Sequence, residues 1–213
     1  MSAGPRALSR PARPPIAVTV GQISQVEGAT CLTQSFVLPH PRETVWALMS
    51  DPVAVAACIP GLSLGVRAAD GAWPGRMEVA LGPIKASFAG IGSIQSFPDT
   101  YAQVIEGRGG DKRSGSQAQG RVDYRLVPEG DATCRVEVAI SYVLAGPLAQ
   151  VGRSAIVRDL VRRIGESFAQ ALDARLSGVD VAPAQPIGGF GLLAQLLRDR
   201  LAALWQVLKG QRG

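Results

Sequence analysis

The sequence has few of the side chains on which metal sites and disulfide frameworks depend. It contains one histidine and three cysteines in 213 residues. Cys31, Cys58 and Cys134 are far apart and odd in number, which is typical of a reducing cytosol and argues against a disulfide framework. A zinc site would need more Cys and His ligands than these. We therefore expect no bound metal and no covalently bound cofactor.

Long apolar runs are absent as well. No stretch approaches the 18 uncharged apolar residues of a transmembrane helix. Met1 is not followed by the apolar segment and small-residue cleavage site of a secretory signal. The composition is still that of a globular chain, with 46% hydrophobic and 18% charged residues. These features predict one cytoplasmic domain with tails.

The formal net charge of +5 is carried by the two ends of the chain. Residues 1–15 contribute +3 and residues 187–213 contribute +3, so the middle sums to −1. Cationic ends suit an anionic surface, such as a membrane or a nucleic acid. Arginine-rich coding is an alternative explanation, since the chain has 19 arginines and 3 lysines.

The order of expected elements predicts an α+β helix-grip fold. A strand over Cys31–Leu38 precedes two short helices, one after Pro41 and one through Val53 to Cys58. From Leu62 to Leu144 the alternation has period two, as in an antiparallel meander with one covered face. Residues 107–115 are expected to form a Gly-rich hairpin tip. A long helix from about Pro147 to Leu176 supplies the apolar stripe around which the curved sheet wraps.

We expect four segments. Residues 1–30 form a disordered or weakly ordered extension, 31–176 the helix-grip domain, 177–189 a Pro/Gly linker and 190–213 a tethered amphipathic helix. The last has a wide apolar face but contains too many charges to span a bilayer, which favours a membrane-surface helix. The alternative is packing on its own domain or on a partner protein. The expected membrane-binding residues are Phe190, Leu193, Leu197, Arg198, Arg200, Leu201, Leu204, Trp205, Leu208 and Lys209.

Small residues recur on the face of the meander that the helix covers. Ala118 and Gly120 share a face with Val122, and Gly90 and Gly92 follow Phe88. Small side chains under a helix either leave space for a ligand or admit the helix closely. The expected cavity lining is Trp46, Met49, Cys58, Ile59, Phe88, Tyr124, Ile140, Tyr142, Ile164 and Phe168. Tyr124 or Tyr142 would hydrogen-bond a ligand carbonyl. His40, before the first helix, is expected to cap it or to be exposed.

Three stretches carry a family resemblance. They are "FVLPHPRETVWALMSDPVAVAACIPG" (Phe36–Gly61), "GPIKASFAG" (Gly82–Gly90) and "AGPLAQVGRSAI" (Ala145–Ile156), with Phe168 further along. Together they resemble the CoxG family of carbon monoxide dehydrogenase proteins, within the polyketide-cyclase/START-like (SRPBCC) helix-grip superfamily. The similarity covers about residues 31–176.

The resemblance implies a non-catalytic accessory protein of a molybdenum hydroxylase of the carbon monoxide dehydrogenase type. It also implies attachment of that enzyme to the inner face of the cytoplasmic membrane, and a cavity for lipophilic molecules. The hollow grip and the tethered helix add a hypothesis: the cavity carries a respiratory quinone, menaquinone or ubiquinone, for electron transfer. No nucleic-acid partner is expected. The alternatives are a ligand-free membrane adaptor and a cyclase-like enzyme, for which the sequence offers no evident buried acid or base.

Overall fold

The computed structural model describes residues 14–81, 84–149 and 155–179. Their strands form one antiparallel sheet in the order β1-β3-β9-β8-β7-β6-β5-β4, and β2 also pairs with β3. The strands are β1 (Thr19–Val20), β2 (Ser24–Val26), β3 (Ala29–Leu38), β4 (Leu62–Leu64), β5 (Trp73–Leu81), β6 (Ile84–Phe97), β7 (Ala102–Asp111), β8 (Ser116–Pro128) and β9 (Cys134–Ala145). The helices are α1 (Arg42–Met49), α2 (Pro52–Ala56) and α3 (Ala155–Leu176), with the 3₁₀ turns η1 (Pro98–Thr100) and η2 (Pro147–Ala149).

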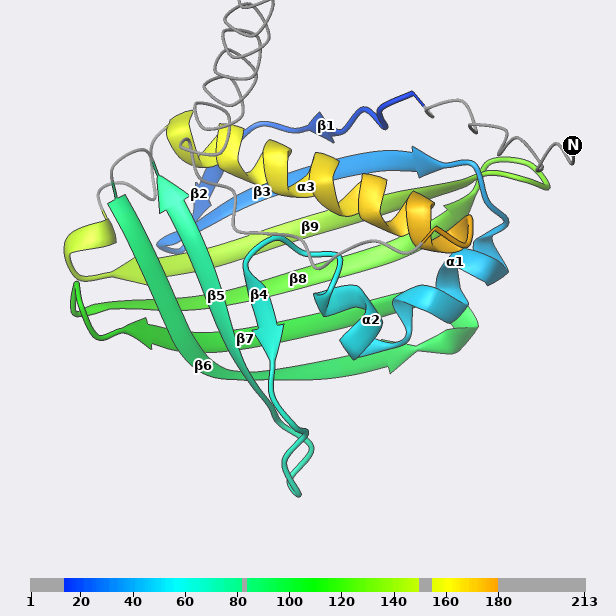
Figure 1. The fold of residues 1–213 in the computed structure, drawn as a ribbon. Coiled ribbons are helices and arrows are strands. Elements are labelled where there is room, and N and C mark those ends of the chain that lie inside the picture. Colours follow the sequence, from blue (N-terminus) through cyan, green and yellow to red (C-terminus); the bar gives the residue numbers. More distant parts are fainter. Residues whose placement is uncertain (1–13, 82–83, 150–154, 180–213) are drawn as a thin grey trace, which may run out of the picture.

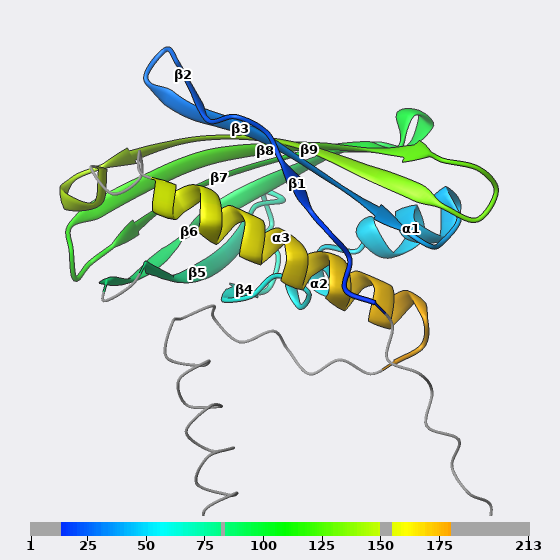
Figure 2. The same cartoon turned by 90° about the horizontal axis from the view of Figure 1, so that it is seen from above.

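The sheet curves around α3, which lies against its concave face, while α1 and α2 lie at one end of the sheet (Figure 1 and Figure 2). This arrangement confirms the predicted α+β helix-grip fold. The period-two alternation positions the core, because one parity of each central strand points towards α3. The buried cluster is Phe36, Leu38, Val45, Met49, Cys58, Tyr124, Leu126, Cys134, Val136, Val138, Ala169, Ala171 and Leu172. It gathers where α1 and the C-terminal half of α3 meet the sheet.

The two short helices begin for different local reasons. The carboxylate of Asp51 accepts hydrogen bonds from the amides of Val53 and Ala54, and Pro52 occupies the first turn of α2. The residue before α1 is Pro41, whose side chain makes no capping hydrogen bond. The sequence had suggested that His40 caps this helix or is exposed. Neither expectation is correct. The Nε2 of His40 lies 2.7 Å from a carboxylate oxygen of buried Asp173 in α3.

Three predicted boundaries are wrong. The described helix α3 begins at Ala155, because Pro147–Ala149 forms a separate 3₁₀ turn after Gly146, whose φ is +81°. Strand β7 continues to Asp111, so only residues 112–115 form the hairpin tip that was expected over 107–115. The sheet also starts before residue 31, since β1 and β2 pair with β3.

The C-terminal predictions lie mostly outside the described residues. These are the linker beyond Val179 and the whole amphipathic helix of 190–213. Among the helices of the described ranges, none is both long enough and apolar enough to cross a bilayer.

Candidate functional site

The concave face carries a band of glycines across its middle strands. The strand register places Gly92 of β6 opposite Gly107 of β7, and Gly107 opposite Gly120 of β8. Gly120 in turn lies opposite Tyr142 of β9. Gly92, Gly107 and Gly120, here called the glycine band, share the parity of the inward-facing residues. The expectation that small residues recur on this face is therefore correct in position.

Two glycines of the band, Gly107 and Gly120, are not small in order to admit α3 closely, whereas a Cβ at Gly92 would lie 3.0 Å from the Glu106 carbonyl oxygen of β7. A Cβ added at Gly107 or Gly120 would meet only atoms of neighbouring strands within 4 Å. For Gly120 these are the Ser141 carbonyl oxygen at 3.5 Å and the Tyr142 Cβ at 3.6 Å. No described atom of α3 comes within that distance of either position.

Other glycines of the fold are small for a different reason. A Cβ at Gly90 would lie 1.9 Å from the Arg108 carbonyl oxygen, and one at Gly109 would lie 2.8 Å from that of Ala89. These two glycines permit the close approach of β6 and β7. On α3, a Cβ at Gly165 would lie 2.8 Å from Gln34 Oε1 of β3. The helix is therefore tightly packed on the β3 side and not over the glycine band.

Apolar side chains surround the open part of the concave face. The row next to the glycine band consists of Ile94, Ile105, Val122 and Ile140, which are all half-buried. Ile164 and Phe168 of α3 are half-buried as well. The backbone of α3 approaches β1 and β3 on one side and β5 on the other, and lies further from β7 and β8 (Figure 2). Partly exposed apolar groups in such a setting suit a lipophilic ligand.

The structure divides the ten predicted lining residues into two groups. Met49, Cys58 and Tyr124 belong to the closed core, with Trp46, Ile140 and Phe168 packed against it. Ile59, Phe88, Tyr142 and Ile164 are half-buried outside that core. Trp46 makes an edge contact with the Tyr101 ring, at a centroid distance of 5.6 Å, and Arg42 stacks on Tyr101. Trp46 thus has a structural role, since it packs α1 against Tyr101.

The two tyrosines expected to contact a ligand differ in their environment. The Tyr124 hydroxyl is buried and donates a hydrogen bond to the Met49 carbonyl at 3.1 Å. Burial raises the pKa of Tyr124, so the phenol stays protonated. Tyr142 lies next to the glycine band, opposite Gly120. Burial raises the pKa of Tyr142 too, with a smaller opposing effect from a hydrogen bond with Thr30.

Sequence reasoning missed a buried polar group on the concave face. Gln103 of β7 is only 5% exposed, and it lies opposite Tyr124 on β8 and Ser96 on β6. Its Nε2 donates to the Ser96 hydroxyl at 3.2 Å. The available signal was parity, since Gln103 and Ile105 alternate with Val104 and Glu106. Because Val104 and Ile105 are adjacent apolar residues, the sequence alone leaves that parity ambiguous.

Two carboxylates, Asp111 and Asp173, are buried, although neither was evident as a buried acid from the sequence. Asp111 accepts hydrogen bonds from the Arg113 amide and the Ser114 hydroxyl, and the first of these is the main cause of its lowered pKa. Asp173 accepts from His40, as described above. Asp111 thus holds the tip of its own hairpin, whereas Asp173 joins α3 to the residue pair before α1. No metal-binding cluster of acidic, His or Cys side chains occurs in the described ranges.

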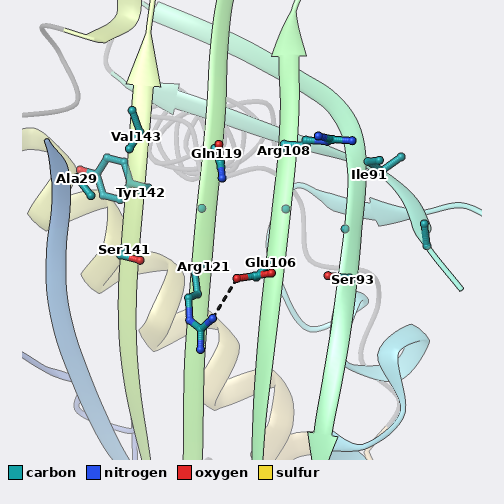
Figure 3. Close-up of a pocket in the computed structure, with 14 residues that line it drawn as sticks. Ala29, Ile91, Ser93, Glu106, Arg108, Gln119, Arg121, Ser141, Tyr142 and Val143 are labelled. Carbon is teal, nitrogen blue, oxygen red and sulfur yellow. Dashed lines mark hydrogen bonds and ion pairs between the residues drawn. The ribbon is translucent and has the colours of Figure 1, made fainter. Parts of the chain in front are cut away.

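A hollow of about 590 Å³ lies on the opposite, convex face of the same strands (Figure 3). Glu106, Arg108 and Arg121 line it, and Arg121 donates to Glu106 at 3.0 Å. Hydrogen bonds to Asp123 and Glu106 raise the pKa of Arg121. The backbone of Gly92, Gly107 and Gly120 also lines this hollow, between the side chains that precede and follow each glycine on its strand. The charged lining is unsuited to a lipophilic ligand.

The fold and the partly open apolar face define a helix-grip protein of the START/SRPBCC type. Residues 35–177 match the model of the family described as the G subunit of carbon monoxide dehydrogenase (CoxG). The chain belongs to this CoxG family. The resemblance stated from the sequence is thereby confirmed. No curated protein matches the chain in sequence.

Solved structures share the fold at low sequence identity. A conserved protein from Geobacillus kaustophilus has a TM-score of 0.60 at 16% identity, covering 68% of this chain and 94% of that one. A protein from Thermus thermophilus has a TM-score of 0.53 at 19% identity, with coverages of 70% and 97%. The human StarD13 (DLC2) lipid transfer and protein localization domain has a TM-score of 0.51 at 11% identity, with coverages of 73% and 84%.

Proposed function

We propose that this chain is a non-catalytic accessory protein of a molybdenum hydroxylase of the carbon monoxide dehydrogenase type. In this proposal it binds a lipophilic ligand, a respiratory quinone, between α3 and the glycine band. The observation that carries it is the space above Gly107 and Gly120, where no described atom of α3 lies within 4 Å of an added Cβ. The half-buried isoleucines and valine beside the band supply the apolar surface that a prenyl tail would cover.

The physical need for such a carrier follows from the location of the two reactants. A molybdenum hydroxylase in the cytoplasm must pass electrons to a quinone, and a quinone with a long prenyl tail stays in the bilayer. The quinone stays there because transfer of apolar surface into water is unfavourable by about 25 cal/mol per Å². A protein that covers the apolar part of the quinone avoids this cost. Menaquinone and ubiquinone both fit this requirement.

The family name supports the partner enzyme, and the sequence supports the membrane. The amphipathic helix expected over residues 190–213 would hold the protein at the inner face of the cytoplasmic membrane. In this account the protein is cytoplasmic and peripheral, and the helix delivers the grip domain to the surface from which the quinone is taken. The human StarD13 domain is named for lipid transfer, which agrees with a lipophilic ligand in this fold.

The test places a large side chain in the proposed site. Gly120→Phe projects a ring over the glycine band, and we expect it to reduce quinone retention at least tenfold. Gly120→Ala adds only a Cβ, whose nearest atoms lie at 3.5 Å and 3.6 Å, so it should retain the ligand.

The matched control is Gln119→Phe, one residue away on β8 but on the convex face, where Gln119 lines the outer hollow. It should leave quinone retention unchanged. Equal retention by Gly120→Phe and the wild type would rule out this site. A wild-type protein that takes up no quinone and still recruits the dehydrogenase to liposomes would instead be a ligand-free adaptor.

A further inference from the structure

Gln103 occupies an unusual position for an uncharged polar side chain. It is 95% shielded from solvent on the concave face of β7, two residues from Ile105 and four from Gly107 on the same face. A strand rises about 3.3 Å per residue, so Gln103 lies about 13 Å from the glycine band. The apolar row that includes Ile105 and Val122 lies between them.

The amide of Gln103 has hydrogen-bonding capacity that the protein does not use. A carboxamide offers two N–H donors and an oxygen with two lone pairs. Within the described ranges, the only side-chain hydrogen bond of Gln103 runs from Nε2 to Ser96. Its Oε1 receives no hydrogen bond within these ranges, so this oxygen can still accept one.

Ser96, the hydrogen-bond partner of Gln103, is in contact with solvent. Ser96, near the end of β6, is exposed although it lies beside a buried residue. The Gln103–Ser96 pair therefore joins a shielded apolar surface on one side to the exterior on the other. A ligand with a polar head and an apolar body matches this change of environment.

The geometry points to the Gln103–Ser96 pair as the anchor for the polar head of the ligand, able to bind that head in either a carbonyl or a hydroxyl form. This inference rests on the proposed function, since it assigns the orientation of the ligand in the same site. The head lies at Gln103 and the apolar body extends along the Ile105 row towards Gly107 and Gly120.

The two forms are accommodated because a hydroxyl and a carboxamide can exchange roles. With Nε2 donating to Ser96, the amide presents Oε1, which accepts a hydrogen bond from a hydroxylated, reduced head. With the amide turned over, the Ser96 hydroxyl donates to Oε1 and an N–H faces a carbonyl of the oxidised head. The Gln103–Ser96 hydrogen bond is kept in both arrangements. The pair thus suits a carrier that takes up one redox form and releases the other.

The experiment measures the affinity of the full-length protein for a short-tailed benzoquinone and, under anaerobic conditions, for its quinol. Isothermal titration calorimetry should give dissociation constants within about threefold of each other for the wild type. Gln103→Met keeps the shape of the side chain but removes its hydrogen bonds, and it should weaken both forms about tenfold. Ser96→Ala, at an exposed position, should weaken both by about threefold.

Gln119→Met is the control, because Gln119 lies on the convex face of β8, and it should bind both forms as the wild type does. Unchanged affinity of Gln103→Met for both forms would overturn the anchor assignment and leave the proposed site intact. A strong preference of the wild type for one form would overturn the dual role. If the wild type binds neither form, the proposed quinone site itself fails, and the anchor with it.

Discussion

The hydroxyl of Tyr124 donates a hydrogen bond to the main-chain carbonyl of Met49 at 3.1 Å, across 75 residues of sequence. This bond ties the last residue of α1 to β8. It also means that the phenol proton is already used. A ligand in the apolar row beside Tyr124 must find its polar contact elsewhere, and Gln103 is the neighbouring group across the strand pair.

Tyr124→Phe should therefore lower stability without lowering quinone affinity. Removing the hydroxyl leaves the buried Met49 carbonyl without that donor, which costs about 1–2 kcal/mol in the free energy of unfolding. Urea denaturation measures this loss, and calorimetry with a short-tailed quinone measures affinity. A tenfold loss of affinity at unchanged stability would show that the hydroxyl contacts the ligand instead.

Gly61, five residues after the end of α2, should not tolerate a side chain. Its φ is +79°, and an added Cβ would overlap the Glu78 carbonyl oxygen of β5. Gly61→Ala should lower the free energy of unfolding by about 2–4 kcal/mol. Gly28→Ala is the matched control, since its φ is +84° but a Cβ there would meet nothing within 4 Å; it should cost only about 1 kcal/mol. Equal losses for both variants would contradict the packing of Gly61 on β5.

Asp111 should stabilise the fold in a pH-dependent way. The Arg113 amide first, and then the Ser114 hydroxyl, lower the pKa of this carboxyl below its ordinary value. Because the pKa is lower in the folded state, the stabilisation is present above the ordinary Asp range, near pH 4, and is lost as the pH falls through the folded-state pKa.

Asp111→Asn should consequently be less stable than the wild type at pH 7, and the difference should shrink below about pH 4. Thermal unfolding between pH 3 and pH 7 tests this. Asp99→Asn, at an exposed position in η1, is the control and should track the wild type. A constant difference between Asp111→Asn and the wild type across that range would show that the ionised carboxylate is not responsible.

The three cysteines should react with thiol reagents at very different rates. Cys58 and Cys134 are fully buried, and burial raises the pKa of Cys134 to about 11 and also raises that of Cys58. Cys31 is partly exposed. At pH 8 the native protein should give one rapid equivalent with a disulfide reagent, and three after unfolding. Rapid modification of Cys31→Ser would contradict the burial of the other two.

The sequence predicted the fold well because its strongest signals are local and periodic. The alternation of Val122, Tyr124 and Leu126 placed these residues correctly on the inner face, and the second short helix was expected from Val53, one residue after α2 begins. Boundaries failed where a backbone feature overrides composition. Gly107 and Gly109 read as a turn but lie within β7, because their role is to leave space or to admit a neighbouring strand.

The candidate site was harder to predict, since it depends on partners far apart in the chain. Small residues on one face are compatible with either space or close packing, and only the distances around Gly107, Gly120 and Gly165 separate the two cases. The His40–Asp173 pair joins residues 133 positions apart, and no local pattern relates them. Gln103 was overlooked because its inward orientation follows from strand register.

The most direct test of the account is to identify what the protein carries when it is purified. Full-length protein would be extracted with organic solvent and the extract analysed by mass spectrometry, beside Gly120→Phe and a denatured blank. The account predicts a near-stoichiometric quinone in the wild type and little in Gly120→Phe. An empty wild-type protein that also fails to take up added quinone would contradict it.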